Sequence, residues 1–267
     1  MTDNSVTGTR GFARRLRDTD HCLWGTWVKI PAMETVEMIA MAGYDFVIID
    51  QEHAPLSFES VYRTTSLAQA LGLQVLVRVP DRSGSHLQRL LDIGVDGIHI
   101  PRISDVAEAR RVARQMMFSP AGERGLGTTA RAGGWGALTR TQYLETGDSD
   151  VMRAVQLEDV AVLEQVEAIV NVPELNGVFL GAGDLALSSG LPSSDPKIEA
   201  LVDRMLAAAA TRGLPCGAAV STAAQAKAAA DRGFRYVMIS NDASIFREAV
   251  TGIRRELAAL ASEKIHD

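Results

Sequence analysis

Short apolar runs alternate with longer amphipathic segments along nearly the whole chain. Continuous apolar runs of this kind are typical of parallel strands that helices cover on their outer side. Eight such runs are expected to be strands, at residues 23–29, 46–50, 75–79, 97–101, 153–157, 177–180, 215–220 and 236–240.

The amphipathic segments between these runs show helix signals. Several begin after Ser, Thr or Asp, whose side chains cap free N–H groups, and several end at a Gly, which permits a left-handed turn. Eight strands that alternate with helices predict an α/β fold, a (β/α)₈ TIM barrel in a single domain, with an open doubly wound sheet as the alternative. The expected helices span residues 34–42, 57–71, 104–117, 160–170, 198–212 and 222–232, and a terminal helix spans 243–261.

The chain divides into an N-terminal extension, residues 1–22, and the barrel, residues 23–267. One connection, about residues 118–150, is longer than the others and rich in Gly. Long loops in compact domains are usually functional. We expect it to be an active-site loop that crosses the mouth of the barrel and also lies near a subunit contact.

Composition narrows the class of protein. The chain has 267 residues, of which 46% are hydrophobic and 22% charged, and this is ordinary for a globular enzyme. A net charge of −6 argues against nucleic acid as the main partner, since phosphate binding needs a basic surface. Its two cysteines, Cys22 and Cys216, exclude a disulfide framework and a zinc motif. No signal peptide or membrane span is apparent, so a cytoplasmic protein is expected.

Polar residues cluster at the ends of four expected strands. A parallel barrel brings the carboxyl ends of its strands to one face, so residues distant in sequence meet there. A histidine, an arginine and two carboxylates are thereby expected in one site. The clusters are Asp50-Gln51-Glu52-His53, Arg78, Gln156-Leu157-Glu158 and Gly181-Ala182-Gly183-Asp184.

Glu158 and Asp184 lie at the ends of neighbouring expected strands. Two carboxylates with open positions for water and substrate suit a hard divalent cation such as Mg²⁺ or Mn²⁺. Alternatively, each carboxylate caps the helix that follows it. Gly181 and Gly183 favour the first interpretation, because backbone without side chains can approach an anion closely.

Four further residues have two interpretations each. His53 is a candidate general acid/base or an ordinary surface histidine, and His99, which alternation directs into the barrel, is a weaker candidate. Arg78 also faces the interior, where it either pairs with a core carboxylate or stabilises an oxyanion. Lys29 ends the first strand and is either a structural ion-pair partner or a Schiff-base nucleophile.

Six segments of the chain, taken in their order and spacing, resemble the motifs of a known family. They are Asp50-Gln51-Glu52-His53-Ala54-Pro55, Val77-Arg78-Val79-Pro80, Leu90-Leu91-Asp92-Ile93-Gly94, Pro120-Ala121-Gly122-Glu123-Arg124-Gly125, Val155-Gln156-Leu157-Glu158 and Gly177-Val178-Phe179-Leu180-Gly181-Ala182-Gly183-Asp184-Leu185. The chain resembles the HpcH/HpaI aldolases from about Trp24 to Val250. These are metal-dependent class II pyruvate aldolases, which include 4-hydroxy-2-oxoheptanedioate and 2-keto-3-deoxy-sugar-acid aldolases.

For the pyruvate half of the site, the resemblance implies five roles. Glu158 and Asp184 match the metal ligands, for Mg²⁺ or Mn²⁺, with Co²⁺ or Zn²⁺ also compatible. Gln156 matches a substrate-binding residue near the metal. Gly183 stands in place of an alanine whose backbone N–H, with that of Asp184, holds the pyruvate carboxylate. Trp27 matches a tryptophan beside the pyruvate methyl group.

For catalysis, the resemblance implies three more residues. Arg78 matches the arginine on the ketone oxygen, and His53 matches the acid/base. Asp92 matches an aspartate that raises the basicity of that histidine from a neighbouring subunit. The resemblance also implies a homo-hexamer, a trimer of dimers with swapped helices.

The implied reaction is reversible aldol cleavage of a 4-hydroxy-2-oxo acid to pyruvate, or a close 2-oxo acid, and an aldehyde. The alternatives are an oxaloacetate decarboxylase or a citryl- or malyl-CoA-type lyase, an aldolase that uses Lys29, and a barrel that only binds a small acid. Gln51, Gly183 and the 126–136 segment depart from the family pattern. They leave the aldehyde partner open more than the pyruvate half.

Overall fold

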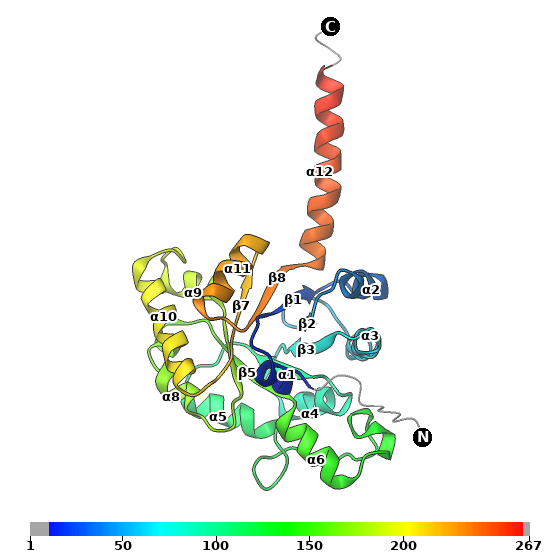
Figure 1. Ribbon diagram of the computed structural model, residues 1–267, viewed down its shortest axis with the longest axis vertical. Coiled ribbons are helices and arrows are strands. Elements are labelled where there is room, and N and C mark those ends of the chain that lie inside the picture. Colours follow the sequence, from blue (N-terminus) through cyan, green and yellow to red (C-terminus); the bar gives the residue numbers. More distant parts are fainter. Residues whose placement is uncertain (1–10, 264–267) are drawn as a thin grey trace.

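The computed structural model, which describes residues 11–263, is a closed barrel of eight parallel strands in the order β1 to β8 (Figure 1). This confirms the predicted barrel and excludes the open sheet. The strands are β1 Leu23–Val28, β2 Phe46–Asp50, β3 Gln74–Arg78, β4 Gly97–Ile100, β5 Met152–Leu157, β6 Gly177–Leu180, β7 Cys216–Val220 and β8 Tyr236–Asn241.

Helices follow the strands and form the outer layer (Figure 1). The capping signals act as expected: Ser57 accepts a hydrogen bond from the N–H of Ser60, and Gly233 ends a helix at φ 116°. The helices are α1 Phe12–Asp18, α2 Met33–Met41, α3 Phe58–Ala70, α4 Gly84–Asp92, α5 Val106–Gln115, the 3₁₀ helix η1 Arg131–Gly136, α6 Arg140–Ser149, α7 Val160–Leu163, α8 Val166–Val170, α9 Ala182–Ser189, α10 Pro196–Thr211, α11 Ala223–Arg232 and α12 Asp242–Glu263.

Some of these helices differ from the expected set. The expected helix at residues 160–170 is two short helices, α7 and α8. The pattern did not predict α1, α6 or α9. In α6, only Tyr143 and Gly147 are buried, so no apolar stripe of helical period exists in its sequence.

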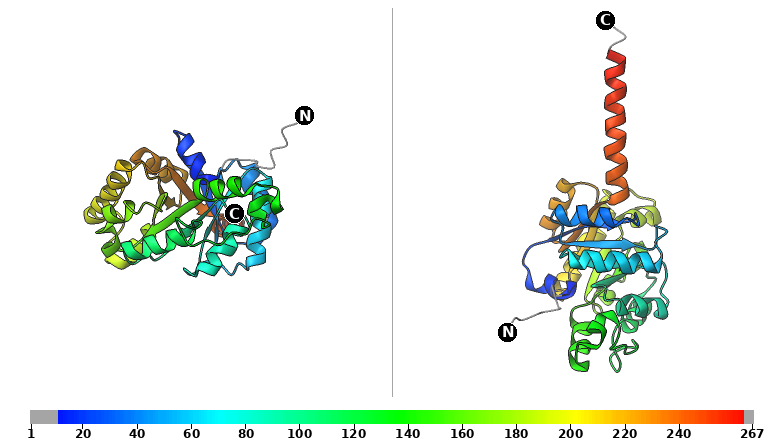
Figure 2. Two further views of the ribbon diagram at one scale, coloured as in Figure 1. Left: turned by 90° about the horizontal axis from the view of Figure 1, so that it is seen from below. Right: turned by 90° about the vertical axis from the view of Figure 1, so that its right-hand side faces the viewer.

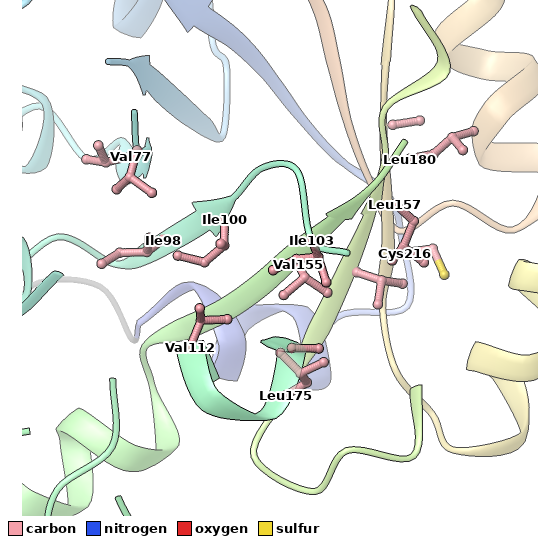
Figure 3. Close-up of a cluster of buried hydrophobic side chains, with 14 of the residues drawn as sticks. Val77, Ile98, Ile100, Ile103, Val112, Val155, Leu157, Leu175, Leu180 and Cys216 are labelled. Carbon is pink, nitrogen blue, oxygen red and sulfur yellow. The ribbon is translucent and has the colours of Figure 1, made fainter. Parts of the chain in front are cut away.

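Side chains from the strands form two separate cores. Those that point outward meet the helices in an aliphatic layer, part of which Figure 3 shows around Val155 and Leu157. Those that point inward fill the barrel with larger residues, among them Phe46, Phe179 and Tyr236. The alternation along each strand therefore decides which residues can reach the mouth of the barrel.

Residues 11–22 of the expected extension belong to the barrel, whereas residues 1–10 lie outside the described part. Helix α1 closes the end at which the strands begin. Phe12 is fully buried, with its ring centroid 4.9 Å from that of Phe46 and 5.6 Å from that of Tyr236. The N–H of Ala13 donates to the carbonyl of Asp150 at 3.0 Å. This segment is thus the floor of the barrel.

The long 118–150 connection packs at this floor rather than across the mouth of its own barrel. Arg131 donates to the Gln69 side chain and the Ile93 carbonyl, both at 2.8 Å, and both acceptors lie where α3 and α4 end. Figure 1 shows α6 beside α4 and α1, at the opposite end of the molecule from α12. The expectation that the connection covers the mouth is wrong within one chain, because its anchors are at the amino ends of the strands.

Helix α12 leaves the barrel instead of covering β8 and β1. Figure 1 and the right-hand view of Figure 2 show it as a straight rod that continues away from the other elements. Its apolar residues are exposed. They are Phe246, Val250, Ile253, Leu257 and Leu260, spaced alternately by four and three residues. No helix in the described range, 11–263, is long and apolar enough to cross a membrane.

Candidate active site

The carboxyl ends of the strands surround a cavity of about 210 Å³. Side chains of Trp27, Arg78, Gln156 and Phe179 reach it from the barrel interior, and Lys29 reaches it from the end of β1. The segment that begins α9, Gly181 to Asp184, forms a further wall. Five sequence-predicted residues, Trp27, Arg78, Gln156, Gly183 and Asp184, therefore line one cavity.

Arg78 is fixed in this cavity by Asp50, which is fully buried. Its Nε and Nη2 donate to the two carboxylate oxygens of Asp50 at 3.0 and 2.8 Å. Lys29 Nζ lies 2.9 Å from the same carboxylate. Burial opposes ionisation of Asp50, but the hydrogen bonds and charges of Arg78 and Lys29 outweigh it and lower its pKa to about 2.

The same carboxylate also shapes the turn after β2. Oδ1 of Asp50 accepts the backbone N–H groups of Glu52 and His53 at 3.1 and 3.2 Å. The turn holds His53 at the rim, with Nε2 3.7 Å from Glu52 and 55% of the side chain exposed. Gln51 is held by His86, 3.0 Å from its side-chain oxygen, and by the Leu56 carbonyl.

Arg78 makes two further contacts that fix the plane of its guanidinium. Nη1 lies 3.2 Å from Glu52, and the guanidinium carbon lies 4.3 Å from the centroid of the Trp27 ring. A rigid donor of this kind costs little entropy when it binds a substrate oxygen. The structure thus shows the pairing with a core carboxylate, and the paired guanidinium still lines the cavity, so its action on an oxyanion stays a prediction.

Glu158 follows β5 and is buried, and Asp184 lies exposed in the first turn of α9. Burial raises the pKa of Glu158, and the nearby carboxylates of Asp184 and Glu52 raise it further. Glu52 is paired with Arg78 and Arg102, but no Lys or Arg among residues 11–263 forms an ion pair with Glu158 or Asp184, and neighbouring carboxylates are unfavourable unless a cation or a proton neutralises them. The donor set thus fits a divalent cation.

Protein ligands for such a cation are few. Among residues 11–263, no three His, Cys, Asp or Glu side chains are arranged to enclose a metal ion. Gln156 Oε1 is buried without a hydrogen-bond partner in the described structure. Glu158 and Asp184 would therefore hold the cation with substrate and water as its other ligands, which leaves open positions for chemistry.

Two glycines at this wall have different constraints. A Cβ on Gly181 would lie 2.5 Å from Glu158 Cβ and 2.7 Å from its Oε2, so a side chain there would displace the carboxylate. A Cβ on Gly183 would meet nothing within 4 Å. The alanine that the family pattern has at position 183 would therefore fit, and only position 181 requires glycine for space.

Asp92 lies far from the cavity in the same chain. It ends α4 at the floor of the barrel, where its Oδ1 is 3.3 Å from Arg124 Nη2 and 3.4 Å from the Tyr143 hydroxyl. His53 follows β2 at the opposite end. One chain therefore does not bring His53 and Asp92 together.

Sequence reasoning missed Arg102, which joins both carboxylate groups of the site. Its N–H donates to Glu158 at 2.5 Å, and its Nε lies 3.1 Å from Glu52. Its φ of 53° is unusual for a residue other than glycine and places the N–H toward Glu158. The only sequence signal was a charged residue directly after the apolar run of β4.

His99 does not reach the cavity. It is fully buried between the rings of Phe179 and Tyr236, with centroids 5.0 and 5.8 Å away. Neither ring nitrogen has a partner among the described residues, and burial, with the charge of Arg78, lowers its pKa to about 3. A permanently neutral histidine in an aromatic layer is part of the core.

A larger cavity, about 510 Å³, lies at the floor of the barrel between α1 and the 118–150 connection. Arg14, Arg124 and Arg131 line it, and of the residues predicted for catalysis only Asp92 lies beside it, in contact with Arg124 and Tyr143. Size alone would therefore have indicated the wrong end of the molecule.

A family model for HpcH/HpaI aldolase/citrate lyase matches residues 24–249. The chain belongs to this family. The hydroxypyruvate/pyruvate aldolase of Paraburkholderia phytofirmans is 33% identical over 88% of the chain and 93% of that protein. The 2-keto-3-deoxy-L-rhamnonate aldolase of Salmonella gallinarum is 28% identical over 90% of each.

A solved structure supports the same assignment to the HpcH/HpaI family. A family protein from Burkholderia cenocepacia has a TM-score of 0.85 and 32% identity, and the match covers 94% of this chain and 100% of that one. As a member of a family whose relatives are aldolases, the chain is a carbon–carbon lyase.

Proposed function

We propose that the protein catalyses reversible aldol cleavage of a 4-hydroxy-2-oxo acid to pyruvate, or a close 2-oxo acid, and an aldehyde. The observation that carries the proposal is the convergence on one cavity of the Arg78 guanidinium and the start of α9 with Asp184, while Glu158 lies buried behind Gly181 of the same wall. These groups match the three polar parts of a 2-oxo acid bound to a cation.

The substrate carboxylate would bind the N–H groups of Gly183 and Asp184. They begin α9, where backbone N–H groups lack helical partners and attract anions. Arg78, held flat by Asp50 and Trp27, would donate to the 2-oxo oxygen, and Gln156 would orient the acid beside it. A donor aimed at a developing enolate oxygen contributes about 10²- to 10³-fold in rate.

His53 would act at the other end of the bond that breaks. It would take the proton of the C4 hydroxyl group, the C3–C4 bond would break, and the aldehyde would leave. Its exposed position at the rim supports access to that hydroxyl group. Asp92 would contact His53 from a neighbouring subunit and raise its basicity, since Asp92 is too distant within one chain.

A divalent cation, Mg²⁺ or Mn²⁺, held by Glu158 and Asp184 would act as a Lewis acid on the 2-oxo group and lower the energy of the enolate. Arg102 would orient Glu158 for this role through its N–H bond.

Lys29 is a poor nucleophile in this arrangement. Its Nζ forms an ion pair with the buried carboxylate of Asp50 at 2.9 Å, so the nitrogen is already engaged there. Schiff-base formation needs the neutral amine. If Lys29 were the nucleophile, borohydride with pyruvate would inactivate the enzyme and EDTA would not.

We propose in addition that the protein is a homo-oligomer built on exchanged α12 helices, with the hexamer as its full form. Phe246, Ile253 and Leu260 lie on one exposed stripe, and Met38 and Met41 of α2 are exposed on the barrel. A helix that leaves its own barrel with apolar residues exposed would be stabilised on the barrel of a second copy.

The proposal is tested with pyruvate, a divalent metal and a panel of aldehydes: succinic semialdehyde, glycolaldehyde, lactaldehyde, glyceraldehyde and an aromatic aldehyde. Product formation that EDTA abolishes and metal restores is the expected result. Pyruvate release from oxaloacetate with no product from any aldehyde would instead identify a decarboxylase. Binding of metal and pyruvate without any reaction would contradict both.

A further inference from the structure

We propose that Lys29 selects 2-oxo acids that carry an oxygen-bearing substituent on C3, because its ammonium group donates to that oxygen. The proposal rests on the function proposed above and names the substrate class of the same cavity. A hydroxyl group and a carboxylate group both offer an oxygen that can accept this hydrogen bond.

The backbone of Lys29 is fixed at the rim of the cavity. Its N–H donates to Asp242 Oδ1 at 2.9 Å, and the N–H of Ile30 donates to Oδ2 at 3.0 Å. Lys29 lies two residues beyond Trp27, which faces the barrel interior. Because side chains alternate along a strand, Lys29 lies directly outward of Trp27 on the same wall.

The ammonium group has donors to spare. Asp50 is the one carboxylate within ion-pair distance of Nζ among residues 11–263, at 2.9 Å. An ammonium group has three N–H donors. The side chain is 26% exposed and lines the cavity, so donors not used by Asp50 are available to a ligand there.

The other walls of the cavity determine which part of the substrate faces Lys29. The start of α9 follows β6 and would take the carboxylate, and Arg78 ends β3 and would take the 2-oxo oxygen. The remaining atom of the acid, C3, then faces β1. Its hydrogens would pack on the Trp27 ring, and a substituent that points outward would meet Lys29.

The chemistry of a partly buried cation makes this contact selective. An oxygen on C3 would accept a charge-assisted hydrogen bond, whereas a methyl group there would desolvate the ammonium without replacing its water. Sites built to bond a polar group discriminate strongly against apolar analogues. Hydroxypyruvate and 2-oxobutanoate differ in this respect alone, since they carry a hydroxyl and a methyl group at the same position.

The test measures removal of the C3 proton without an aldehyde. Deuterium incorporation at C3 in D₂O, followed by NMR, gives kcat/KM for hydroxypyruvate and for 2-oxobutanoate. We expect Lys29→Met to lower the ratio of the two values by about 10-fold or more, the effect of losing one charge-assisted bond. Lys29→Arg should retain much of the ratio. Lys227→Met, on exposed α11, is the matched control and should not change it.

A second arm identifies the substituent. The inhibition constant of oxaloacetate against pyruvate exchange should rise in Lys29→Met if the bound group is a carboxylate. A loss in either arm supports the proposal and names the group, and no loss in both overturns it. A general loss of activity through Asp50 cancels in the ratio of the first arm, and in the second arm the inhibition constant is divided by the KM of pyruvate for the same reason.

Two results would not bear on Lys29 itself: a wild-type protein without exchange activity, and a variant that does not fold. If the wild-type protein exchanges no C3 proton of any 2-oxo acid, the proposed function fails, and not the role of Lys29 alone. Circular dichroism checks folding, and Lys29→Gln, which removes the charge but keeps a donor for Asp50, replaces Lys29→Met if that variant does not fold. An unchanged ratio together with an unchanged inhibition constant in the folded variant contradicts the selection by Lys29.

Discussion

Asp50 shows how a single side chain can order a whole site. Its two oxygens accept bonds from Arg78 and from the N–H groups of Glu52 and His53, and Lys29 pairs with it. The residues that would contact substrate are thereby fixed relative to one another before substrate binds. Such preorganisation is the usual source of catalytic power in polar sites.

Replacement of His53 by alanine tests its role as acid/base. We expect kcat for aldol cleavage to fall about 10²- to 10⁴-fold, because a positioned base contributes that much. Metal binding, measured by calorimetry, should stay close to wild type, since Glu158 and Asp184 are untouched. Full activity in the variant would show that another group moves the proton.

The two glycines beside Glu158 provide a matched pair. Gly181→Ala should weaken metal binding about 10- to 100-fold, as is typical when the orientation of a ligand is disturbed, because the new methyl group would overlap Glu158. Gly183→Ala should keep the metal affinity, since its methyl group meets nothing within 4 Å. Calorimetric titration of both variants with the metal ion tests this prediction. Equal metal affinities of the two variants would contradict the steric role of Gly181.

At the scale of elements, the pattern predicted the barrel and all eight strands because most strands are short, nearly continuous apolar runs that alternate with amphipathic segments. It could not predict where the 118–150 connection packs, because Arg131 bonds the end of α4 through one side chain and leaves no pattern in the sequence. The candidate site was likewise predicted only in part from the sequence. Strand-end polarity indicated Arg78 and Glu158, whereas the link by Arg102 depends on a left-handed backbone that its sequence does not signal.

The contact between α3 and the start of β4 leads us to predict that the stability of the fold depends on pH. Asp96 is fully buried and accepts bonds from Gln69 Nε2 and the N–H of Val75, both on Oδ2. Burial raises its pKa from 3.8 to about 6, so the folded state binds this proton more tightly than the unfolded state. Its contribution to stability is therefore full below about pH 4 and is lost as the pH rises through 6.

Asp96→Asn removes this dependence while its amide oxygen can still accept both bonds. We expect the free energy of unfolding of the variant at pH 7, measured by urea denaturation, to exceed that of the wild type by up to roughly 3 kcal/mol. This is the energy equivalent of that pKa shift. The difference should shrink toward pH 4. Parallel stability curves of the two proteins from pH 4 to 7 would argue against an ionisation cost at Asp96.

At the scale of the whole molecule, two features of one chain bear on assembly. Helix α12 leads away from β8 (Figure 1) and carries an exposed apolar stripe, and Asp92 ends α4 at the end of the barrel opposite the one where His53 follows β2. The proposed oligomer would explain both features, since one copy would supply a helix and another would supply a carboxylate. Activity should then depend on assembly as well as on the cavity.

Charge on the α12 stripe should separate the copies. We expect Ile253→Glu to lower the mass measured by light scattering, because burial of a carboxylate in an apolar contact is costly. Aldol activity should fall with it, since Asp92 would no longer reach a neighbouring site. Arg255→Glu, on another face of the same helix, is the control and should assemble normally. An unchanged mass for Ile253→Glu would remove α12 from the interface.

Asp242 connects these two scales. It is the first residue of α12, and its carboxylate accepts the N–H groups of Ala243, Lys29 and Ile30. The direction in which the helix departs and the wall of the cavity that holds Lys29 are thus set by the same two oxygen atoms. If a neighbouring copy shifted α12, the carboxylate of Asp242 would move with the helix and so would the backbone of Lys29 that it binds. Subunit packing would then change which acid the cavity accepts.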